Sequence, residues 1–231
     1  MNGLQGTGEK QGSRRRIGIS GGTFDPVHYG HLVIAEEARE AFRLEKILFI
    51  PSGNPPHKAG RDVTPARHRY EMVRRAVRDN PYFEVSGIEI NREGSSYTMD
   101  TLRELRGVYG ENTDFYFIIG ADIIPELTTW KYFEQVFGMC EFIAALRPGY
   151  NKDALIKEVE YLENNYRARI HIFGSLLIGV SSTMVRERVR KGRTIKYLVP
   201  GSVEEYIREK GLYRYRDNGD INGILANGLR K

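Results

Sequence analysis

Two histidines lie three residues apart in a glycine-rich segment near the start of the chain. The segment runs Gly21-Gly22-Thr23-Phe24-Asp25-Pro26-Val27-His28-Tyr29-Gly30-His31, and this spacing lets His28 and His31 face the same side of a helix start. Glycines allow the backbone to approach a phosphate closely, and the amides of a helix that follows Gly30 attract an anion. Each imidazole can donate a further hydrogen bond to a phosphate oxygen. The segment therefore predicts a phosphate-binding turn.

Other interpretations of the two histidines are weaker. A zinc site needs a third ligand, and the segment does not have the H-E-x-x-H spacing of zinc helices. It also matches neither the Walker A pattern nor G-x-G-x-x-G, so a P-loop or a dinucleotide oxidoreductase has no support. Simple surface histidines would not explain the Gly-Gly-Thr-Phe-Asp-Pro run that precedes them. No metal-ligating residue is predicted.

A second segment offers another anion site. Ile178-Gly-Val-Ser-Ser-Thr-Met-Val-Arg186 has the composition of a strand end, a hydroxyl-rich cap and a helix start, with Ser181, Ser182 and Thr183 available as caps. The helix amides can hold an anion, and Arg186 adds a fixed positive charge. An ordinary capped helix with a solvated arginine is the alternative. The two segments together are more specific than either alone.

Two further stretches carry candidate substrate contacts. Pro55-Pro-His57-Lys58 follows the second expected strand, where prolines stiffen the backbone and His57 and Lys58 can reach an anion. A solvated surface loop is the alternative. Ser96-Tyr-Thr-Met-Asp-Thr-Leu102 is expected to lie at a helix start. Thr98 can cap that helix, and the amides exposed there can also hold a carboxylate.

Asp122 and Trp130 complete the candidate set. Asp122 follows the apolar run Phe115-Tyr-Phe-Ile-Ile119, so it lies at the C-terminal edge of an expected strand. A carboxylate at that edge can accept ribose hydroxyl protons, with a helix N-cap as the alternative role. Trp130 follows a short polar turn, and core packing is the alternative for a single tryptophan.

Short apolar runs alternate with amphipathic stretches from Arg16 onward, which is the pattern of βα units around a parallel sheet. This order predicts an α/β fold, a Rossmann-like doubly wound parallel sheet with helices on both faces. Strands are expected at Ile17–Ser20, Lys46–Pro51, Phe83–Ile90, Phe115–Gly120, Glu141–Leu146 and Arg169–Phe173. Helices are expected at His31–Phe42, Pro65–Asp79, Met99–Tyr109, Trp130–Phe137, Lys152–Tyr166, Ser182–Lys191 and Ser202–Lys210.

The charged residues are unevenly distributed. The net charge is +5, of which residues 1–16 carry +3 and residues 214–231 carry +2, so that residues 17–213 are neutral. A neutral folded part argues against a nucleic-acid partner. Residues 1–15 are predicted to be a disordered leader and residues 214–231 a polar tail, because both are polar and rich in glycine. Residues 16–213 then form one domain.

The single cysteine and the lengths of the apolar runs indicate the cellular compartment of the protein. Cys140 excludes an intramolecular disulfide and a multi-cysteine zinc site, and it borders the apolar run Phe142–Leu146 as a buried thiol would. No stretch approaches the roughly 18 consecutive apolar residues of a membrane span, and the N-terminus has no apolar signal core. We therefore expect a cytoplasmic protein with no membrane partner.

The two anion-binding segments resemble those of a known superfamily. Gly21 to Leu32 resembles the signature of the nucleotidyltransferases with the H-x-G-H motif, which is similar to that of class I aminoacyl-tRNA synthetases. Ile178 to Arg186 resembles the family's I-S-S-T-x-x-R motif, with Val180 in place of isoleucine. From about Ile17 to Tyr213 the chain resembles the bacterial nicotinate-nucleotide adenylyltransferases. The resemblance implies transfer of the adenylyl group of ATP to nicotinate mononucleotide, forming nicotinate adenine dinucleotide and pyrophosphate in NAD biosynthesis.

The resemblance also implies roles in a nucleotidyltransferase domain that covers residues 16–213. His28, His31 and Arg186 are the expected catalytic residues. Mg²⁺ is expected to accompany ATP as a cofactor, held through phosphates and water rather than through a cage of carboxylates. The expected ATP-binding residues are Gly21, Gly22, Thr23, Phe24, Gly30, Asp122, Ser181, Ser182 and Thr183.

The mononucleotide is expected to contact a separate set. The resemblance assigns the phosphate to the loop with His57 and Lys58, and it places Thr98 nearest the pyridine ring. Trp130 is expected to stack on that ring. Lys131 follows Trp130 where several family members carry an aromatic residue, which leaves the details of ring recognition open.

Three other functions remain alternatives. A sister transferase would use nicotinamide mononucleotide, phosphopantetheine or a cytidine nucleotide on the same phosphate-binding segments. A non-catalytic nucleotide sensor could share the fold, although the intact His28, His31 and Arg186 argue against it. A tRNA synthetase would need an anticodon-binding extension, and none is visible in the neutral, short folded part. The sequence leaves open whether the chain forms a homo-oligomer.

Overall fold

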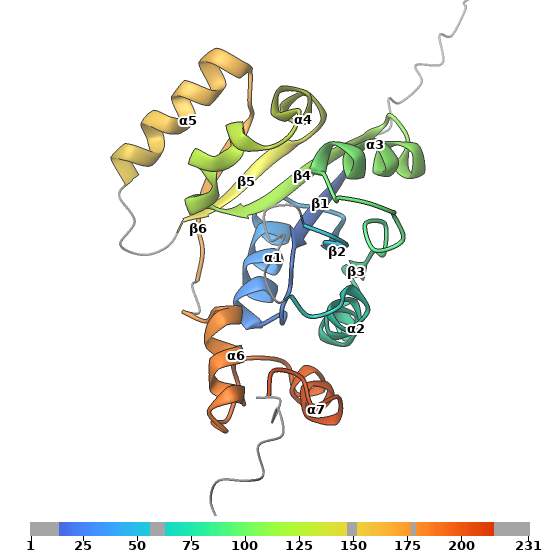
Figure 1. Ribbon diagram of the computed structural model, residues 1–231. Coiled ribbons are helices and arrows are strands. Elements are labelled where there is room, and N and C mark those ends of the chain that lie inside the picture. Colours follow the sequence, from blue (N-terminus) through green and yellow to red (C-terminus); the bar gives the residue numbers. More distant parts are fainter. Residues whose placement is uncertain (1–13, 56–62, 147–151, 177–178, 215–231) are drawn as a thin grey trace, which may run out of the picture.

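The computed structural model describes residues 14–55, 63–146, 152–176 and 179–214, which form one parallel sheet with helices around it (Figure 1). The strand order is β3-β2-β1-β4-β5-β6, the order of doubly wound folds, whose ligands bind where the order reverses. That reversal lies between β1 and β4. The strands are β1 (Arg15–Gly22), β2 (Lys46–Pro51), β3 (Phe83–Val85), β4 (Thr113–Gly120), β5 (Glu141–Leu146) and β6 (Ile170–Gly174).

The first strand begins slightly before the boundary expected from the sequence. Arg15 opens β1, and its side chain forms an ion pair with Glu45 at 2.6 Å. Arg14 pairs with Asp114 at 2.8 Å, so both arginines join the start of the sheet. Residues 1–13 and 215–231, on which most of the expected leader and tail fall, lie outside the described residues.

The third strand is much shorter than the predicted strand Phe83–Ile90, and the prediction is wrong after Val85. The chain turns at Ser86 and Gly87: the Ile88 amide donates to the Ser86 hydroxyl at 3.3 Å, and the amides of Ile90 and Asn91 donate to the Gly87 carbonyl at 3.0 Å. These local bonds replace ladder bonds. The apolar residues beyond the turn serve packing instead, because Ile88 contacts the core.

Seven α-helices and one 3₁₀ helix are assigned among the described residues. The 3₁₀ helix η2 was not predicted, and it displaces the helix expected from Trp130. Tyr132 adopts a left-handed conformation with φ of 59°, so that the next helix begins only at Phe133. The helices are α1 (Tyr29–Ala41), α2 (Ala66–Val77), α3 (Thr98–Tyr109), η2 (Ala121–Thr129), α4 (Phe133–Met139), α5 (Lys152–Tyr166), α6 (Ser182–Arg190) and α7 (Gly201–Glu209).

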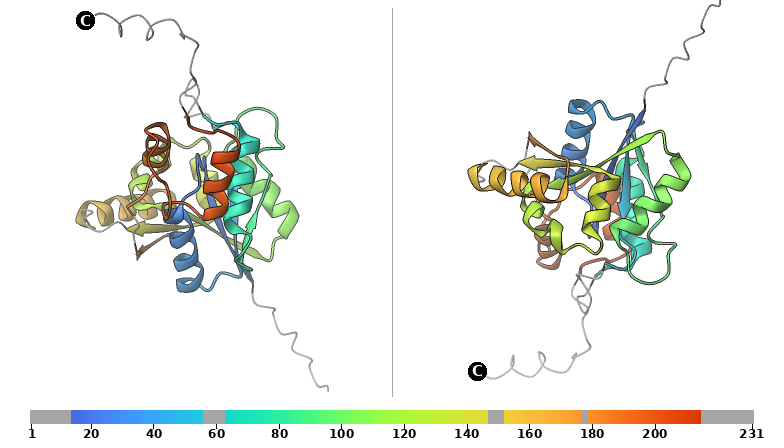
Figure 2. Two further views of the ribbon diagram at one scale, coloured as in Figure 1. Left: turned by 90° about the horizontal axis from the view of Figure 1, so that it is seen from below. Right: turned by 90° about the horizontal axis from the view of Figure 1, so that it is seen from above.

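Helices cover both faces of the sheet, as predicted, and each face has its own buried cluster (Figure 2). Strand β2 shows how the sequence divides between them: Leu48 and Ile50 enter the cluster under α3, α4, α5 and η2, whereas Ile47 and Phe49 enter the one under α1, α2, α6 and α7. Alternate side chains of a strand point to opposite faces. This division explains why the strand sequences are almost continuously apolar: strands of a sheet that is covered on both faces bury both sets of side chains.

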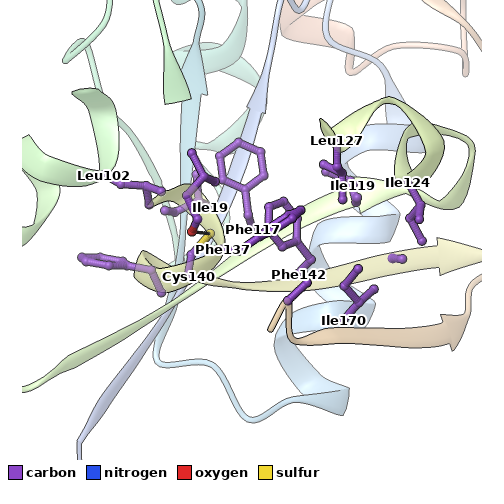
Figure 3. Close-up of a cluster of buried hydrophobic side chains, with 14 of the residues drawn as sticks. Ile19, Leu102, Phe117, Ile119, Ile124, Leu127, Phe137, Cys140, Phe142 and Ile170 are labelled. Carbon is purple, nitrogen blue, oxygen red and sulfur yellow. Dashed lines mark hydrogen bonds between the residues drawn. The ribbon is translucent and has the colours of Figure 1, made fainter. Parts of the chain in front are cut away.

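Cys140 lies within the first of these clusters, beside the aromatic rings drawn in Figure 3. The thiol is 1% exposed and donates to the Val136 carbonyl at 3.5 Å. Burial raises the pKa of this thiol far above its usual range, because a thiolate would lack solvation. The expectation of a buried thiol is therefore confirmed. In the part of the chain that the structure describes, no helix has the length and apolar character to cross a membrane.

Candidate active site

The glycine-rich segment leaves β1 at the point where the strand order reverses and leads directly into α1. Gly21 is required by packing, since a Cβ there would lie 2.8 Å from Cζ of Phe117 on β4. Phe24 takes a left-handed conformation with φ of 50°, and its 3% exposed ring lies against His31 and Phe49 with centroid distances of 5.0 and 6.0 Å. Any contact of Phe24 with a nucleotide therefore has to come from its backbone.

The two imidazoles are stacked at the start of α1. Their ring centroids lie 3.7 Å apart with an interplanar angle of 21°, and His28 is the N-cap of the helix. The His28 amide donates to Nδ1 of His31 at 3.2 Å. Because Nδ1 accepts this bond, the neutral ring carries its proton on Nε2. Burial, followed by the charge of His28, lowers the pKa of His31 well below its usual value. His31 is thus a neutral donor at physiological pH.

A depressed pKa makes the folded protein sensitive to acid. As pH falls through about 6.5, the unfolded chain binds a proton at His31 before the folded chain does, so stability that is present above that pH is lost below it. We expect the wild-type protein to lose about 1 kcal/mol more unfolding free energy between pH 7.5 and 5.5 than a His31→Asn variant. Urea unfolding at both pH values measures the difference. Equal losses would contradict the depressed pKa.

The second predicted segment docks directly onto the first (Figure 1). Ser182 donates its hydroxyl to the Pro26 carbonyl at 2.8 Å, and Arg186 donates from Nη1 to the Asp25 carbonyl at 2.6 Å. Ser181 is the N-cap of α6, because its hydroxyl accepts from the Met184 amide at 3.2 Å. The start of α6 therefore lies beside the segment from Gly21 to His31, hereafter the histidine turn, and the two predicted phosphate segments are in direct contact.

Thr183 supports the arginine of this site from one turn earlier in α6. Nη2 of Arg186 donates to the Thr183 hydroxyl at 3.3 Å, so that the guanidinium bonds both the turn and its own helix. Arg186 is half-buried, whereas Thr183 is exposed. Arg186 is therefore not simply a solvated arginine on this capped helix, because its guanidinium bonds the histidine turn.

Residues that no sequence pattern pointed to hold the turn from behind. Asp25 is 5% exposed, and its carboxylate accepts from the Tyr213 hydroxyl at 2.7 Å and from the Thr64 amide at 3.3 Å. Burial raises the pKa of Tyr213 far above its usual value, so that this hydroxyl remains a donor. Arg69, which is 1% exposed, donates to the Thr64 carbonyl at 2.8 Å.

The turn expected to line the mononucleotide pocket lies at the start of α3. Thr98 is the first helical residue and Tyr97 occupies the cap, so the alternative of Thr98 as the helix cap is wrong. Ser96 and Asn54 bond each other reciprocally: the Asn54 amide donates to the Ser96 hydroxyl at 3.2 Å, and the Ser96 amide donates to the Asn54 carbonyl at 3.1 Å. This turn is therefore fixed to the end of β2. His57 and Lys58 lie outside the described residues.

Trp130 follows η2 and lies partly within the core. Its ring meets Phe117 and Phe142 edge-on, with centroid distances of 5.7 and 6.2 Å, so core packing is part of its role. Its neighbour Lys131 places Nζ 4.2 Å from the ring centroid of Tyr97. This contact brings the segment after η2 next to the start of α3. Trp130 and Thr98 thus belong to one region.

Asp122 lies in the first turn of η2, immediately after β4 ends at the reversal point. The N-cap of η2 is Gly120, so the alternative of Asp122 as the cap is wrong. A Cβ at Gly120 would collide with Oδ1 of Asp122, which shows that the carboxylate folds back over the strand end. In the described parts of the chain, no group of three or more His, Cys, Asp or Glu side chains is arranged to hold a metal ion.

Comparisons with known proteins agree with this geometry. A family model described as cytidylyltransferase-like matches residues 19–188. A probable nicotinate-nucleotide adenylyltransferase of Moorella thermoacetica is 52% identical over 213 residues, which cover 92% of this chain and 96% of the relative. A protein of the same name from Thermoanaerobacter sp. is 50% identical over 209 residues, covering 90% and 98%.

A solved structure supports the fold. Plasmodium falciparum nicotinic acid mononucleotide adenylyltransferase, complexed with NaAD, matches with a TM-score of 0.71 and 20% identity, covering 86% of this chain and 97% of that one. The histidine turn and the docked α6 start both lie within the residues that the family model matches. The chain therefore belongs to the cytidylyltransferase-like family, among its nicotinate-nucleotide adenylyltransferases.

Proposed function

We propose that the chain transfers the adenylyl group of ATP to nicotinate mononucleotide, which yields nicotinate adenine dinucleotide and pyrophosphate. One observation carries this proposal: Ser182 and Arg186 bond the backbone of the histidine turn at the reversal of the strand order, which supports one anion site for ATP there. The start of α3 and Trp130 pack on the other face of the sheet, and we assign the mononucleotide to them. The chain is an enzyme of NAD biosynthesis.

The chemistry requires no covalent intermediate on the protein. An oxygen of the mononucleotide phosphate forms a bond to the α-phosphorus of ATP, and the bond from that phosphorus to the bridging oxygen of pyrophosphate breaks. The acceptor is already an anion at neutral pH, so catalysis consists of alignment and stabilisation of charge. His31 donates Nε2–H to the α-phosphate, and His28 binds a neighbouring phosphate oxygen. Arg186 holds the departing pyrophosphate.

The remaining expected ATP contacts are assigned around these three residues. Backbone amides of Gly21 to Phe24 and of Gly30 face the phosphates, and the first turn of α6 from Ser181 to Thr183 adds further amides. Asp122 accepts the ribose hydroxyls from the end of β4. Support for this assignment comes from the contacts that join the histidine turn to α6.

Mg²⁺ is part of the proposal as the ion that accompanies ATP. Mg²⁺ binds triphosphate oxygens while keeping several waters, so it needs few protein ligands. Bound in that way it would neutralise charge on the phosphates. We also assign the reaction to the cytoplasm, where ATP is abundant and a single free thiol stays reduced.

The deciding experiment compares acceptors. Pyrophosphate release is measured with ATP and Mg²⁺ in the presence of nicotinate mononucleotide, nicotinamide mononucleotide or phosphopantetheine. We expect kcat/KM for nicotinate mononucleotide to exceed the others by about 100-fold, because polar groups placed for a carboxylate are left unpaired by a substrate that lacks it. Higher kcat/KM for another acceptor would identify a sister transferase. ATP binding without release for any acceptor would identify a sensor.

A further inference from the structure

Arg69 is the largest fully buried side chain among the described residues and lies on α2, outside both predicted phosphate segments in the sequence. Its guanidinium donates to three backbone carbonyls: Nη1 to Thr23 at 2.7 Å, Nη2 to Gly53 at 3.1 Å and Nε to Thr64 at 2.8 Å. Buried arginines usually pair with carboxylates. Here the fork of one guanidinium instead joins the histidine turn, the end of β2 and the residues that precede α2.

The hydrogen bond to Gly53 connects Arg69 with the turn at the start of α3, to which we assign the mononucleotide. A Cβ at Gly53 would collide with the Glu89 carbonyl, so this backbone is tightly confined. The next residue, Asn54, makes the reciprocal backbone and hydroxyl bonds with Ser96. A continuous series of hydrogen bonds therefore runs from Thr23, through Arg69 and Gly53, to the turn that begins α3.

We propose that Arg69 is a positioning residue for adenylyl transfer, which fixes the ATP-binding turn relative to the mononucleotide-binding turn. The inference rests on the proposed function, since it concerns the alignment of those two substrates. Transfer requires reacting atoms to be held about 3 to 3.5 Å apart in line, and a misplacement of about 1 Å can lower the rate about 100-fold. A lysine ammonium keeps the charge but cannot span three carbonyls as a planar guanidinium does.

A purely structural role for Arg69 is the competing explanation, and the chain offers a matched control for it. Arg106 on α3 also donates to backbone carbonyls, from Nη1 to Thr113 at 2.7 Å and from Nη2 to Met139 at 3.4 Å. Thr113 opens β4, so Arg106 lies at the opposite edge of the sheet from the site. Loss of its bonds should reduce stability without disturbing substrate alignment.

The test measures kcat, both KM values and the thermal midpoint for Arg69→Lys, Arg106→Lys and the wild-type protein. We expect Arg69→Lys to lower kcat about 100-fold while each KM changes less than about threefold. Arg106→Lys should lower the thermal midpoint and leave kcat within about twofold of wild type. Arg69→Lys with wild-type kcat, or equal loss of kcat in both variants, would overturn the inference.

A second variant keeps the inference testable if Arg69→Lys does not fold. Ser96→Ala removes the acceptor of the Asn54 amide and should lower kcat about tenfold at nearly unchanged KM. If Arg69→Lys does fold, the double variant should lose less than the product of the two single losses, because both act on one series of bonds. Unchanged kcat for Ser96→Ala would count against the inference. Absence of turnover in the wild-type protein would instead contradict the proposed function.

Discussion

Replacing His31 with alanine should lower kcat for adenylyl transfer about 10² to 10³-fold while the protein stays folded. The ring is fixed before substrate arrives, because Nδ1 accepts from the His28 amide and the ring is stacked on His28. A donor fixed in this way stabilises charge that develops at the α-phosphate, and loss of one such donor typically costs this much. Pyrophosphate release under saturating substrates measures the effect.

The size of that effect can be judged against another histidine. His171 on β6 is paired with Glu141 through Nε2 and Oε2 at 2.7 Å, at the opposite edge of the sheet, where β5 begins. His171→Ala should therefore leave kcat within about twofold of wild type. Circular dichroism should show that both variants are folded. If the folded His31→Ala variant has near-normal turnover, the proposed role of His31 at the α-phosphate is wrong.

Replacing Arg186 with alanine should reduce kcat/KM for ATP about 10² to 10³-fold. Two losses combine in this variant: a positive charge disappears from the phosphate site, and the Asp25 carbonyl loses the guanidinium that bonds it at 2.6 Å. Arg186→Lys should recover only part of the activity, since an ammonium restores the charge but not the forked geometry that also reaches Thr183. Steady-state kinetics with varied ATP separate the three proteins.

The control for Arg186 is on the same helix. Arg190 lies one turn further along α6, where it is exposed and makes no contact with the histidine turn among the described residues. Arg190→Ala changes the net charge equally and should leave kcat/KM for ATP within about twofold. If the two alanine variants lose the same activity, Arg186 acts only through general electrostatic attraction and its place in the site is wrong.

The contact between the two predicted phosphate segments was largely predictable, because the signals of each segment are local. Each segment can be recognised from neighbouring residues in the sequence: glycines and two histidines at helical spacing in the first, and a hydroxyl-rich cap in the second. A parallel sheet then brings the ends of its strands, and the segments that follow them, to one edge. Arg69 had no such signal, since its partners at Thr23 and Gly53 are distant in sequence and are backbone carbonyls, which every residue type carries. Tyr213 was missed for the same reason.

The errors in the secondary structure have a different origin. The strand predicted through Ile90 ended at Val85 because Ser86 and Gly87 offer local hydrogen bonds that compete with the sheet. The helix predicted from Trp130 was delayed by the left-handed backbone of Tyr132, a conformation that residue type alone does not suggest for a tyrosine. In both places the contacts of the folded chain, rather than the apolar pattern, selected the backbone conformation.

The bond between Tyr213 and Asp25 has a consequence for how the protein is made. The turn after β1 is among the first parts of the domain to be synthesised, yet its carbonyls are bonded by Ser182 and Arg186 and its carboxylate by Tyr213. A nascent chain that ends before α6 lacks all three of these bonding partners. We therefore expect ATP binding to begin only after Tyr213 has left the ribosomal exit tunnel.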